Sequence, residues 1–336
     1  MSEVVVVGST NWDIAMYLPS LPLPGETVAG GTLQSGLGGK GANQAVAAFR
    51  AGGATTCFIS CIGDDDIANS VRQVFSELQM PIPEVRVIDG IGTGSACIFV
   101  NAEAENCIGI ASGANACVLP AMIDEQAARI SSAGAVLVQL EIPFETIERI
   151  AVICAENQTP FVLNPAPARD IPEALLPMID ILTPNEVELS QISGMPSGTL
   201  EEVTIAAQSL CNQGVGTVVT TLGSRGCLIV AKTSTEFIES FKVAAVDTTA
   251  AGDVFNGALV AELVRGEAII LGDWQNTPDD LGKHFLVTKM GMRVCVPSGV
   301  DATCTAGFFF SRLVCGVPPD VAAKWQQKPA ASECAH

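Results

Sequence analysis

The sequence predicts an α/β protein with a central, mostly parallel sheet that carries helices on both faces. The main observation is the regular alternation of helix-like and strand-like segments from residue 122 onward, which is typical of a parallel sheet. A second is the run of four valines at 4–7 that ends at Gly8, as expected of a fully buried strand. Two early hairpin-like regions interrupt the alternation, and we expect them to form a small accessory sheet or lid.

The first half of the chain combines strands, turns and two helices. Residues 14–33 contain several Pro and Gly, so we expect short strands and turns there. Residues 101–105 are polar and separate two strand-like runs, which predicts a hairpin. The other elements expected, in order, are a helix at 42–51, a strand at 55–62, an amphipathic helix at 67–78 and the hairpin strands 95–100 and 106–110.

The second half predicts the parallel part of the sheet. In order, we expect a helix after residue 122, a strand at 135–140, a helix at 145–156, a strand at 160–164, a helix near 172–177, a strand at 179–183, a helix at 199–212, a strand at 217–221, a hairpin-like pair at 226–232 and 236–246, and a helix at 254–264. No linker, repeat or low-complexity segment divides the chain, so we expect one domain over 1–336.

Composition narrows the classes of partner and compartment. The 336 residues carry a formal charge of −19, which disfavours nucleic acid or an anionic membrane as a partner. The twelve cysteines lie scattered in apolar segments without a CxxC pair, as expected of buried, reduced thiols. The N-terminus lacks the pattern of a signal peptide, and no apolar run reaches about 18 residues. We therefore expect a cytoplasmic protein without a membrane segment.

The turn at 247–257 leads from a strand-like run into a helix and is built of small residues. Unpaired amides and the helix dipole favour an anion at such a place, which makes the acid Asp253 unexpected there. One interpretation is an ordinary helix-capping acid. The other is a general base held beside the phosphate that a substrate hydroxyl attacks.

The glycine-rich segment 36–44 has two interpretations as well. Gly36, Gly38 and Gly41 match the dinucleotide fingerprint in spacing, but the first apolar strand of the chain does not precede them directly. The segment either presents Lys40 and Asn43 to a small polyhydroxylated ligand or forms a tight turn with a solvated lysine.

Polar side chains also gather after the expected strands. Each alone is more simply a cap or turn residue, but the carboxyl ends of parallel strands converge on one crevice, so together they favour a site. They are Asn11, Asp13, Glu141, Asn164, Asn185, Glu186 and Glu188. The turn at 221–226, with two glycines and Thr221, is either a phosphate-binding turn or a simple hairpin turn.

Five motifs together resemble the ribokinase family of carbohydrate kinases. The resemblance runs in order from about residue 4 to residue 263. The motifs are Gly38-Gly39-Lys40-Gly41-Ala42-Asn43-Gln44, Asn164-Pro165-Ala166-Pro167-Ala168, Thr183-Pro184-Asn185-Glu186, Thr221-Leu222-Gly223-Ser224-Arg225-Gly226, and the turn 247–257. The resemblance implies a three-layer α/β/α fold, and a small β-sheet lid made of the hairpins near 14–33 and 93–111, which also forms the contact of a homodimer.

The resemblance also implies ATP-dependent phosphorylation of D-ribose at its 5-hydroxyl. Asp253 corresponds to the base, and the amides of Ala250, Ala251, Gly252 and Asp253 correspond to the anion hole. The sugar-binding positions are matched by Asn11, Asp13, Gly39, Lys40, Asn43, Glu141 and Asp253. The nucleotide side is matched by Asn185, Thr221, Gly223, Ser224, Gly226 and Gly252.

Two cations follow from the same resemblance. Glu188, three residues after Asn185, matches the motif that organises Mg²⁺ through water near the phosphates. Asp247 and Thr249 match part of an activating K⁺ site, and Gly299 and Thr303 correspond to its later loop. Residues 285–292 lack the small residues and the polar adenine contact usual in the family, and 308–336 form an atypical C-terminal tail.

Three functions stay open at this point. The first is a kinase of D-ribose, and the second is a related kinase of another sugar, such as deoxyribose or fructose. The third is a catalytically weak sugar- or nucleotide-binding protein, motivated by the unusual C-terminal region. The match at the sugar positions favours ribose, and an intact Asp253 argues against a mere binding protein.

Overall fold

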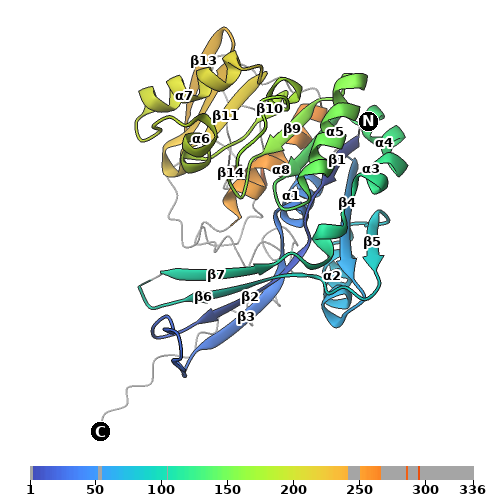
Figure 1. The fold of residues 1–336 in the computed structure, drawn as a ribbon, viewed down its shortest axis with the longest axis vertical. Coiled ribbons are helices and arrows are strands. Elements are labelled where there is room, and N and C mark those ends of the chain that lie inside the picture. The colour runs from blue at the N-terminus through green and yellow to red at the C-terminus, as the bar shows by residue number, and fades with distance from the viewer. Residues whose placement is uncertain are drawn as a thin grey trace.

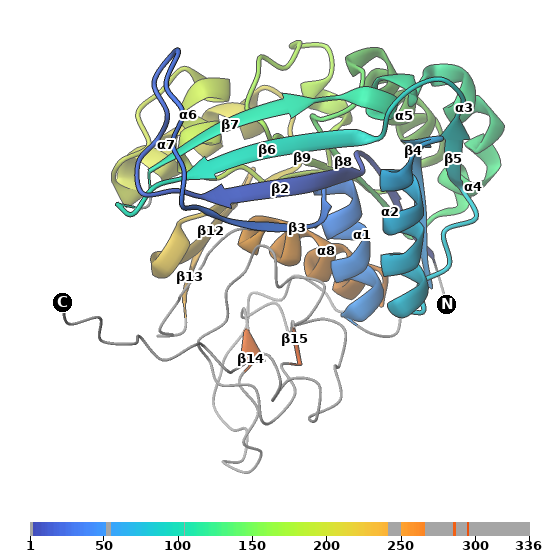
Figure 2. The same cartoon turned by 90° about the horizontal axis from the view of Figure 1, so that it is seen from below.

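A computed structural model describes residues 3–51, 55–103, 105–240 and 250–265, with two further short strands, β14 (Phe285–Leu286) and β15 (Val294–Cys295). Its main body is a large twisted sheet between two layers of helices, and a smaller sheet extends from one side (Figures 1 and 2). The turn residues 247–249, the loop at 298–303 and the tail 308–336 lie outside the described residues.

The large sheet has nine strands in the order β13-β12-β11-β10-β9-β8-β1-β4-β5. The seven strands β11, β10, β9, β8, β1, β4 and β5 are parallel to one another. The remaining two, β12 and β13, form an antiparallel hairpin at one edge. The strands are β1 (Glu3–Val7), β4 (Thr55–Gly63), β5 (Val85–Ile88), β8 (Ala135–Gln139), β9 (Phe161–Asn164), β10 (Ile181–Leu182), β11 (Thr217–Thr221), β12 (Gly226–Ala231) and β13 (Ser234–Glu239). The predicted parallel sheet is thus confirmed.

The four valines of β1 show how the three layers form. Val5 and Val7 face one core, whereas Val4 and Val6 face the other, because successive side chains of a strand alternate in direction. The first core is covered by α3 (Pro120–Glu125), α4 (Ala127–Ser132), α5 (Phe144–Asn157), α6 (Glu186–Ser193) and α7 (Leu200–Asn212). The second is covered by α1 (Lys40–Arg50), α2 (Asp66–Glu77) and α8 (Ala251–Val264).

The small sheet is larger than the sequence predicted. Its four strands, in the order β3-β2-β6-β7, are β2 (Asn11–Tyr17), β3 (Thr32–Gly38), β6 (Gly94–Val100) and β7 (Asn106–Ala111). The expected bounds of 14–33 were wrong at both ends, because Asn11 and Asp13 pair with Gly38 and Gly36 as antiparallel partners. Asn11 and Asp13 therefore lie in a strand. The glycine-rich segment 36–44 contains the end of β3 at Gly38 and the start of α1 at Lys40, with Gly39 between them.

Other differences have local causes. The helix expected near 172–177 is only a short 3-10 turn at Leu176–Met178, since Pro177 has no amide hydrogen to donate and its ring clashes with the preceding turn of an α-helix. The strand β5 and the helix α6 were not predicted; α6 begins at a capping box formed by Asn185 and Glu188.

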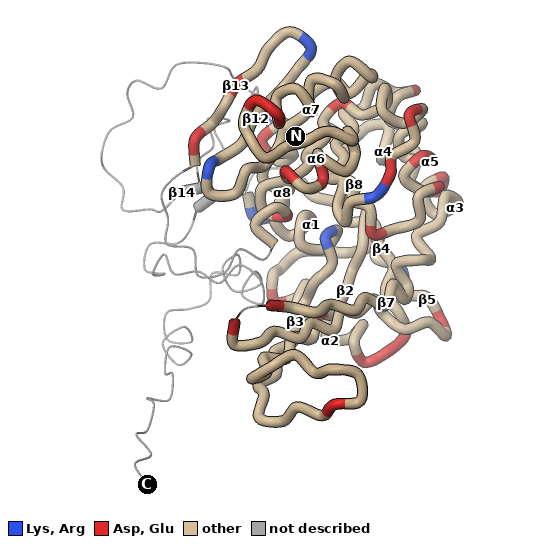
Figure 3. The backbone as a smooth tube through the Cα atoms, turned by 60° about the vertical axis from the view of Figure 1, so that its left-hand side comes forward, with Lys and Arg blue, Asp and Glu red and all other residues tan. Residues whose placement is uncertain are grey.

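Within the described part of the chain, no helix is long and apolar enough to cross a membrane. Lys and Arg there are few and separated along the backbone (Figure 3).

The helices α1 and α8 pack unusually close to one another at Gly257. A β-carbon at this position would lie 2.4 Å from both the Gln44 carbonyl oxygen and the Ala47 β-carbon. Such distances are far below van der Waals contact, so only glycine allows this approach. The contact sets the distance between the first turns of the two helices.

We expect Gly257→Ala to destabilise the protein by on the order of 1–3 kcal/mol, the usual cost of overpacking. Alanine is the better helix former by about 1 kcal/mol, so helix propensity alone would raise the free energy of unfolding. A fall in the free energy of unfolding therefore reports the clash. Urea unfolding measures it. Gly252→Ala, in the same helix but with no atom of the described residues within 4 Å of the added carbon, is the stability control. Equal stability of the two variants would contradict a tight α1–α8 contact.

Candidate active site

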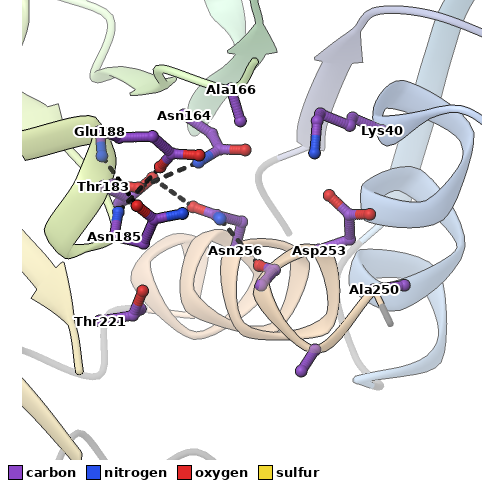
Figure 4. A pocket seen from close by; sticks show the side chains of 12 residues that line it. Lys40, Asn164, Ala166, Thr183, Asn185, Glu188, Thr221, Ala250, Asp253 and Asn256 are labelled. Atoms are coloured by element: carbon purple, nitrogen blue, oxygen red, sulfur yellow. Dashed lines mark hydrogen bonds between the residues drawn. The ribbon is translucent and has the colours of Figure 1, made fainter. Parts of the chain in front are cut away.

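The candidate site is a cavity of about 190 Å³ at the carboxyl ends of the central strands. It lies between the N-terminal turns of α1 and α8 on one side and the start of α6 on the other (Figure 4). Its lining residues are Lys40, Asn164, Ala166, Thr183, Asn185, Glu188, Thr221, Ala250, Ala251, Gly252, Asp253 and Asn256. Nearly all come from the motifs that the sequence singled out.

Asp253 lies in the first turn of α8 and is only 6% exposed. Its Oδ2 accepts a hydrogen bond from Asn43 Nδ2 at 3.0 Å, and its Oδ1 accepts one from Gln44 Nε2 at 2.9 Å. Burial raises the pKa of this carboxyl, while nearby Lys40 and the two amide donors lower it. Lys40 points toward the same cavity (Figure 4). A buried carboxylate with an ammonium group and two donors at hand can accept a proton.

The first amides of α8 have no hydrogen-bond partner in the part of the chain that the structure describes. Ala250 adopts a left-handed backbone with φ of 60°, an uncommon conformation for a residue with a side chain. The amides of Ala251, Gly252 and Asp253 form no hydrogen bond to any residue that the structure describes, as the first turn of a helix allows. All three residues line the cavity, so it offers a place for an anion beside Asp253.

The side chains expected to bind sugar gather at the base of the small sheet. Glu141 Oε2 accepts hydrogen bonds from Ser9 Oγ at 2.5 Å and from the Lys40 amide at 3.0 Å. These bonds tie the loop after β8 to the start of α1 and engage one carboxylate oxygen of Glu141. Its other oxygen forms no hydrogen bond to the described residues.

Asn11 is oriented by a residue that the sequence did not reveal, Asn115. Asn115 Oδ1 accepts the Thr10 amide at 2.8 Å, so its Nδ2 must be the group that donates to Asn11 Oδ1 at 2.7 Å. Asn11 is thereby left with its Nδ2 as donor for a ligand oxygen. Asn115 was missed because it lies 104 residues away in the sequence, in a short 3-10 helix at Gly113–Cys117.

Glycines create the space beside these side chains. A β-carbon at Gly38 would lie 2.2 Å from the Asp13 carboxyl group, and Gly39, with φ of 87°, would place one 2.7 Å from the Asn11 amide. Burial raises the pKa of Asp13 to about 7, with further contributions from Glu141 and Asp253 that Lys40 opposes. Asp13, Glu141, Lys40 and Asp253 are therefore close enough to interact.

On the opposite side of the cavity, Asn185 and Glu188 form the capping box of α6. Asn185 Oδ1 accepts the Glu188 amide and Glu188 Oε2 accepts the Asn185 amide, both at 2.8 Å. The capping interpretation of these residues therefore holds, although both also line the cavity. Burial raises the pKa of Glu188, against the effect of the Asn185 amide and Lys40.

The turn after β11 starts beside this capping box. Thr221 forms a β-bridge with Asn185 and lines the same cavity. Gly226 has φ of 117° and leaves no room for a β-carbon, which would lie 1.9 Å from the Ile238 carbonyl oxygen. Gly223 and Ser224 form the exposed corner of the turn. Their proposed contact with a nucleotide remains a prediction.

The expected K⁺ ligands Asp247, Thr249, Gly299 and Thr303 lie outside the described residues. Within the described ranges, no group of three or more His, Cys, Asp or Glu side chains forms a metal site. A single carboxylate such as that of Glu188 is compatible with Mg²⁺, because this ion keeps most of its water and takes one or two carboxylates together with substrate phosphates. Its Oε1, unlike its Oε2, forms no hydrogen bond to a described residue.

Buried polar side chains connect the two sides of the cavity. Asn164 was among the candidates that follow the expected strands, whereas Thr183 and Asn256 had no role predicted from the sequence. Asn164 Nδ2 donates to the Thr183 carbonyl oxygen at 2.9 Å, and Thr183 Oγ1 donates to Asn256 Oδ1 at 2.5 Å. Asn256 Nδ2 in turn donates to the Gly252 carbonyl oxygen at 2.8 Å, in the turn that holds Asp253. Gln44 joins the same network. Its place in a motif was visible, but its contacts depend on the packing of α1 against α8.

The chain is similar to known carbohydrate kinases in both sequence and fold. Residues 1–270 match the model of the pfkB family carbohydrate kinases. The chain is 38% identical to a ribokinase of Haemophilus influenzae over 299 residues, which cover 88% of this chain and 95% of that protein. It is 33% identical to a deoxyribokinase of Salmonella typhi, over 78% of this chain and 86% of that one. Arabidopsis thaliana ribokinase, solved with ribose and ATP, matches with a TM-score of 0.74 and 34% identity, over 79% of this chain and 86% of that one.

The raised pKa of Asp13 predicts how stability depends on pH. Its protonated form is favoured by the folded state, so its contribution to stability is lost as the pH rises through about 7. Asp13→Asn removes this effect. We therefore expect the free energy of unfolding of the variant, relative to that of the wild type, to rise by on the order of 1–3 kcal/mol when the pH is raised from 5 to 8.5. Urea unfolding at the two pH values measures this difference. A stability difference that does not change with pH would contradict the raised pKa.

Proposed function

The chain belongs to the pfkB family of carbohydrate kinases, and we propose that it transfers the γ-phosphoryl group of ATP to O5 of D-ribose, giving D-ribose 5-phosphate. The observation that carries this proposal is the placement of Asp253, a buried carboxylate in the first turn of α8, whose first amides form no hydrogen bond to the described residues. The ribokinase relatives, including the structure with ribose and ATP, support ribose as the acceptor.

The proposed step is a direct displacement at the γ-phosphorus. As O5 forms its bond to phosphorus, its proton passes to an oxygen of Asp253, and the bond between the γ-phosphorus and the bridging oxygen breaks to release ADP. The amides of Ala251, Gly252 and Asp253, in the turn that begins at Ala250, stabilise the charge on the transferring group. Lys40 adds a positive charge at the same cavity.

The sugar would be oriented by groups with complementary hydrogen-bonding character. Asn11 offers its Nδ2 as a donor, and Glu141 offers as an acceptor the carboxylate oxygen that forms no hydrogen bond to a described residue. Asp13 and Asn43 flank them, and the absence of side chains at Gly38 and Gly39 lets the ligand approach the backbone. Holding the acceptor hydroxyl against Asp253 accounts for much of catalysis in a reaction that depends on positioning.

The nucleotide and the cations would occupy the other side. We assign the phosphates to the Thr221–Gly226 turn and Gly252, and assign Mg²⁺, through water, to Glu188. When bound, Mg²⁺ neutralises charge on the phosphate oxygens. An activating K⁺ is assigned to Asp247, Thr249, Gly299 and Thr303 on the resemblance alone.

A homodimer formed through the small sheet, in the cytoplasm, completes the proposal. In its support, β7 is exposed along its whole length, and Ile108 and Ile110 are 52% and 58% exposed. Apolar side chains exposed together at the edge of a sheet favour a protein contact.

Deoxyribose is the alternative acceptor, since deoxyribokinases are among the relatives at 33% identity. The two sugars differ by one hydroxyl, and a site that hydrogen-bonds this hydroxyl discriminates strongly against the sugar that lacks it. A sugar- or nucleotide-binding protein without activity is the remaining alternative. It would have no use for a buried base at the anion site.

We expect Asp253→Asn to lower kcat by about 100-fold or more, because the amide cannot accept the proton. Ribose should still bind, as calorimetry would measure, since Asn11, Asp13 and Glu141 are unchanged. Asp64→Asn, an exposed acid before α2, is the matched control and should keep wild-type turnover. Near-normal turnover of Asp253→Asn would refute the role of this residue.

Sugar-dependent ADP release distinguishes the proposed substrates. We expect the highest kcat/KM with ribose in a panel that includes deoxyribose and fructose, and lower activity when Na⁺ replaces K⁺. A higher kcat/KM with deoxyribose or fructose would reassign the substrate. If no sugar raises ADP release above background, both kinase functions are excluded and only a binding protein is left.

A further inference from the structure

A row of buried amides lies directly behind Asp253. Gln139 Nε2, at the end of β8, donates to Gln44 Oε1 at 2.6 Å. Gln44 Nε2 then donates to both Asp253 Oδ1 and Asn164 Oδ1, each at 2.9 Å. Gln44 and Gln139 are fully buried. One side chain of α1 therefore joins β8, β9 and α8 at the candidate base.

The donor and acceptor atoms in this row are fixed by its two ends. Asn164 Nδ2 must face the Thr183 carbonyl oxygen, which only accepts, so its Oδ1 faces Gln44. An ionised Asp253 also only accepts, so Gln44 must present its NH₂ group to both neighbours. Both protons of this group are thereby used. The carbonyl oxygen of Gln44 is left for Gln139, and rotation of the Gln44 amide by 180° would break all three bonds.

We propose that Gln44 is a positioning residue for the phosphoryl-transfer step: its amide fixes the orientation of the Asp253 carboxylate and favours its ionised, proton-accepting form. The inference rests on the proposed role of Asp253 as the base. Gln44 is distinct from Asn43, which also contacts Asp253 but is partly exposed toward the expected sugar. Because Gln44 has no exposed surface, it acts on the reaction through Asp253.

The charges around Asp253 explain why such a donor matters. Glu141 after β8, Asp13 in β2 and Glu188 in α6 are acidic groups that interact unfavourably with an ionised Asp253. Lys40 in α1 is the cationic group that opposes them within the described residues. Burial acts in the same direction as the acidic groups, because both favour the protonated, inactive form of Asp253. A hydrogen bond to the charged form works in the other direction, and Gln44 supplies one that solvent does not reach.

The test is the pH dependence of kcat in Gln44→Met, measured with both substrates saturating so that it reports groups in the ternary complex. Methionine has nearly the same length but no donor. We expect the acidic limb to move up by about one pH unit or more, the scale of a lost charge-assisted hydrogen bond. The loss of kcat should then be about tenfold near the wild-type acidic limb and should largely recover at higher pH. The Kd for ribose should change by less than about threefold.

Thr146→Val is the matched control for general loosening of the core. It removes another fully buried hydrogen bond, from Thr146 Oγ1 to the Val118 carbonyl oxygen at 2.6 Å, on α5. We expect a similar fall in melting temperature but no shift of the pH profile. Should Gln44→Met fail to fold, Gln44→Glu keeps the shape, and its carboxyl group should move the acidic limb up further by repulsion.

The outcomes separate cleanly. A loss of kcat that is equal at all pH values, or a shift of the same size in Thr146→Val, would overturn the positioning role and leave Gln44 as a packing residue. So would an unchanged profile in Gln44→Glu. A wild-type protein without sugar-dependent ADP release would overturn the proposed function as well.

Discussion

The contact between the first turns of α1 and α8 is the constraint on which the site depends. It brings a carboxylate, Asp253, into a buried position where Asn43 and Gln44 donate to its two oxygens. The approach is close because Gly257 has no side chain to separate it from the Gln44 backbone. Burial raises the pKa of this carboxyl, and the hydrogen bonds from Asn43 and Gln44 act against that rise because they favour the ionised form, which can act as a base.

The parallel sheet supplies the remainder of the site from its strand ends. Gln139, Asn164 and Thr183 follow one another across β8, β9 and the end of β10, and their hydrogen bonds lead from Gln44 to the turn of α8. The same edge carries Glu141 on the sugar side and Thr221 on the opposite side. One network of polar side chains therefore links Asp253, the turn at the start of α8 and both sides of the crevice, as expected where strand ends converge.

The sequence predicted what depends on local pattern. The valines of β1 and the alternation of strands and helices were sufficient to predict the sheet, and five motifs in order along the chain were sufficient to predict the family. Features that depend on pairing or packing were not predicted: the extension of the small sheet to Asn11, set by its partner Gly38, and the contacts of Gln44 and Asn115 across about 100 residues or more. For Asn185 and Glu188 the capping interpretation was also correct, since one capping box can serve a helix and face a cavity.

The most direct test of this account is a crystal structure of the protein with ribose and a non-hydrolysable ATP analogue. The account predicts that one carboxylate oxygen of Asp253 lies about 3 Å from the 5-hydroxyl of the sugar, with this hydroxyl in line with the γ-phosphorus. Gln44 should retain its hydrogen bond to the other side of the base. A 5-hydroxyl placed against a different proton acceptor, with Asp253 hydrogen-bonded only within the protein, would contradict it.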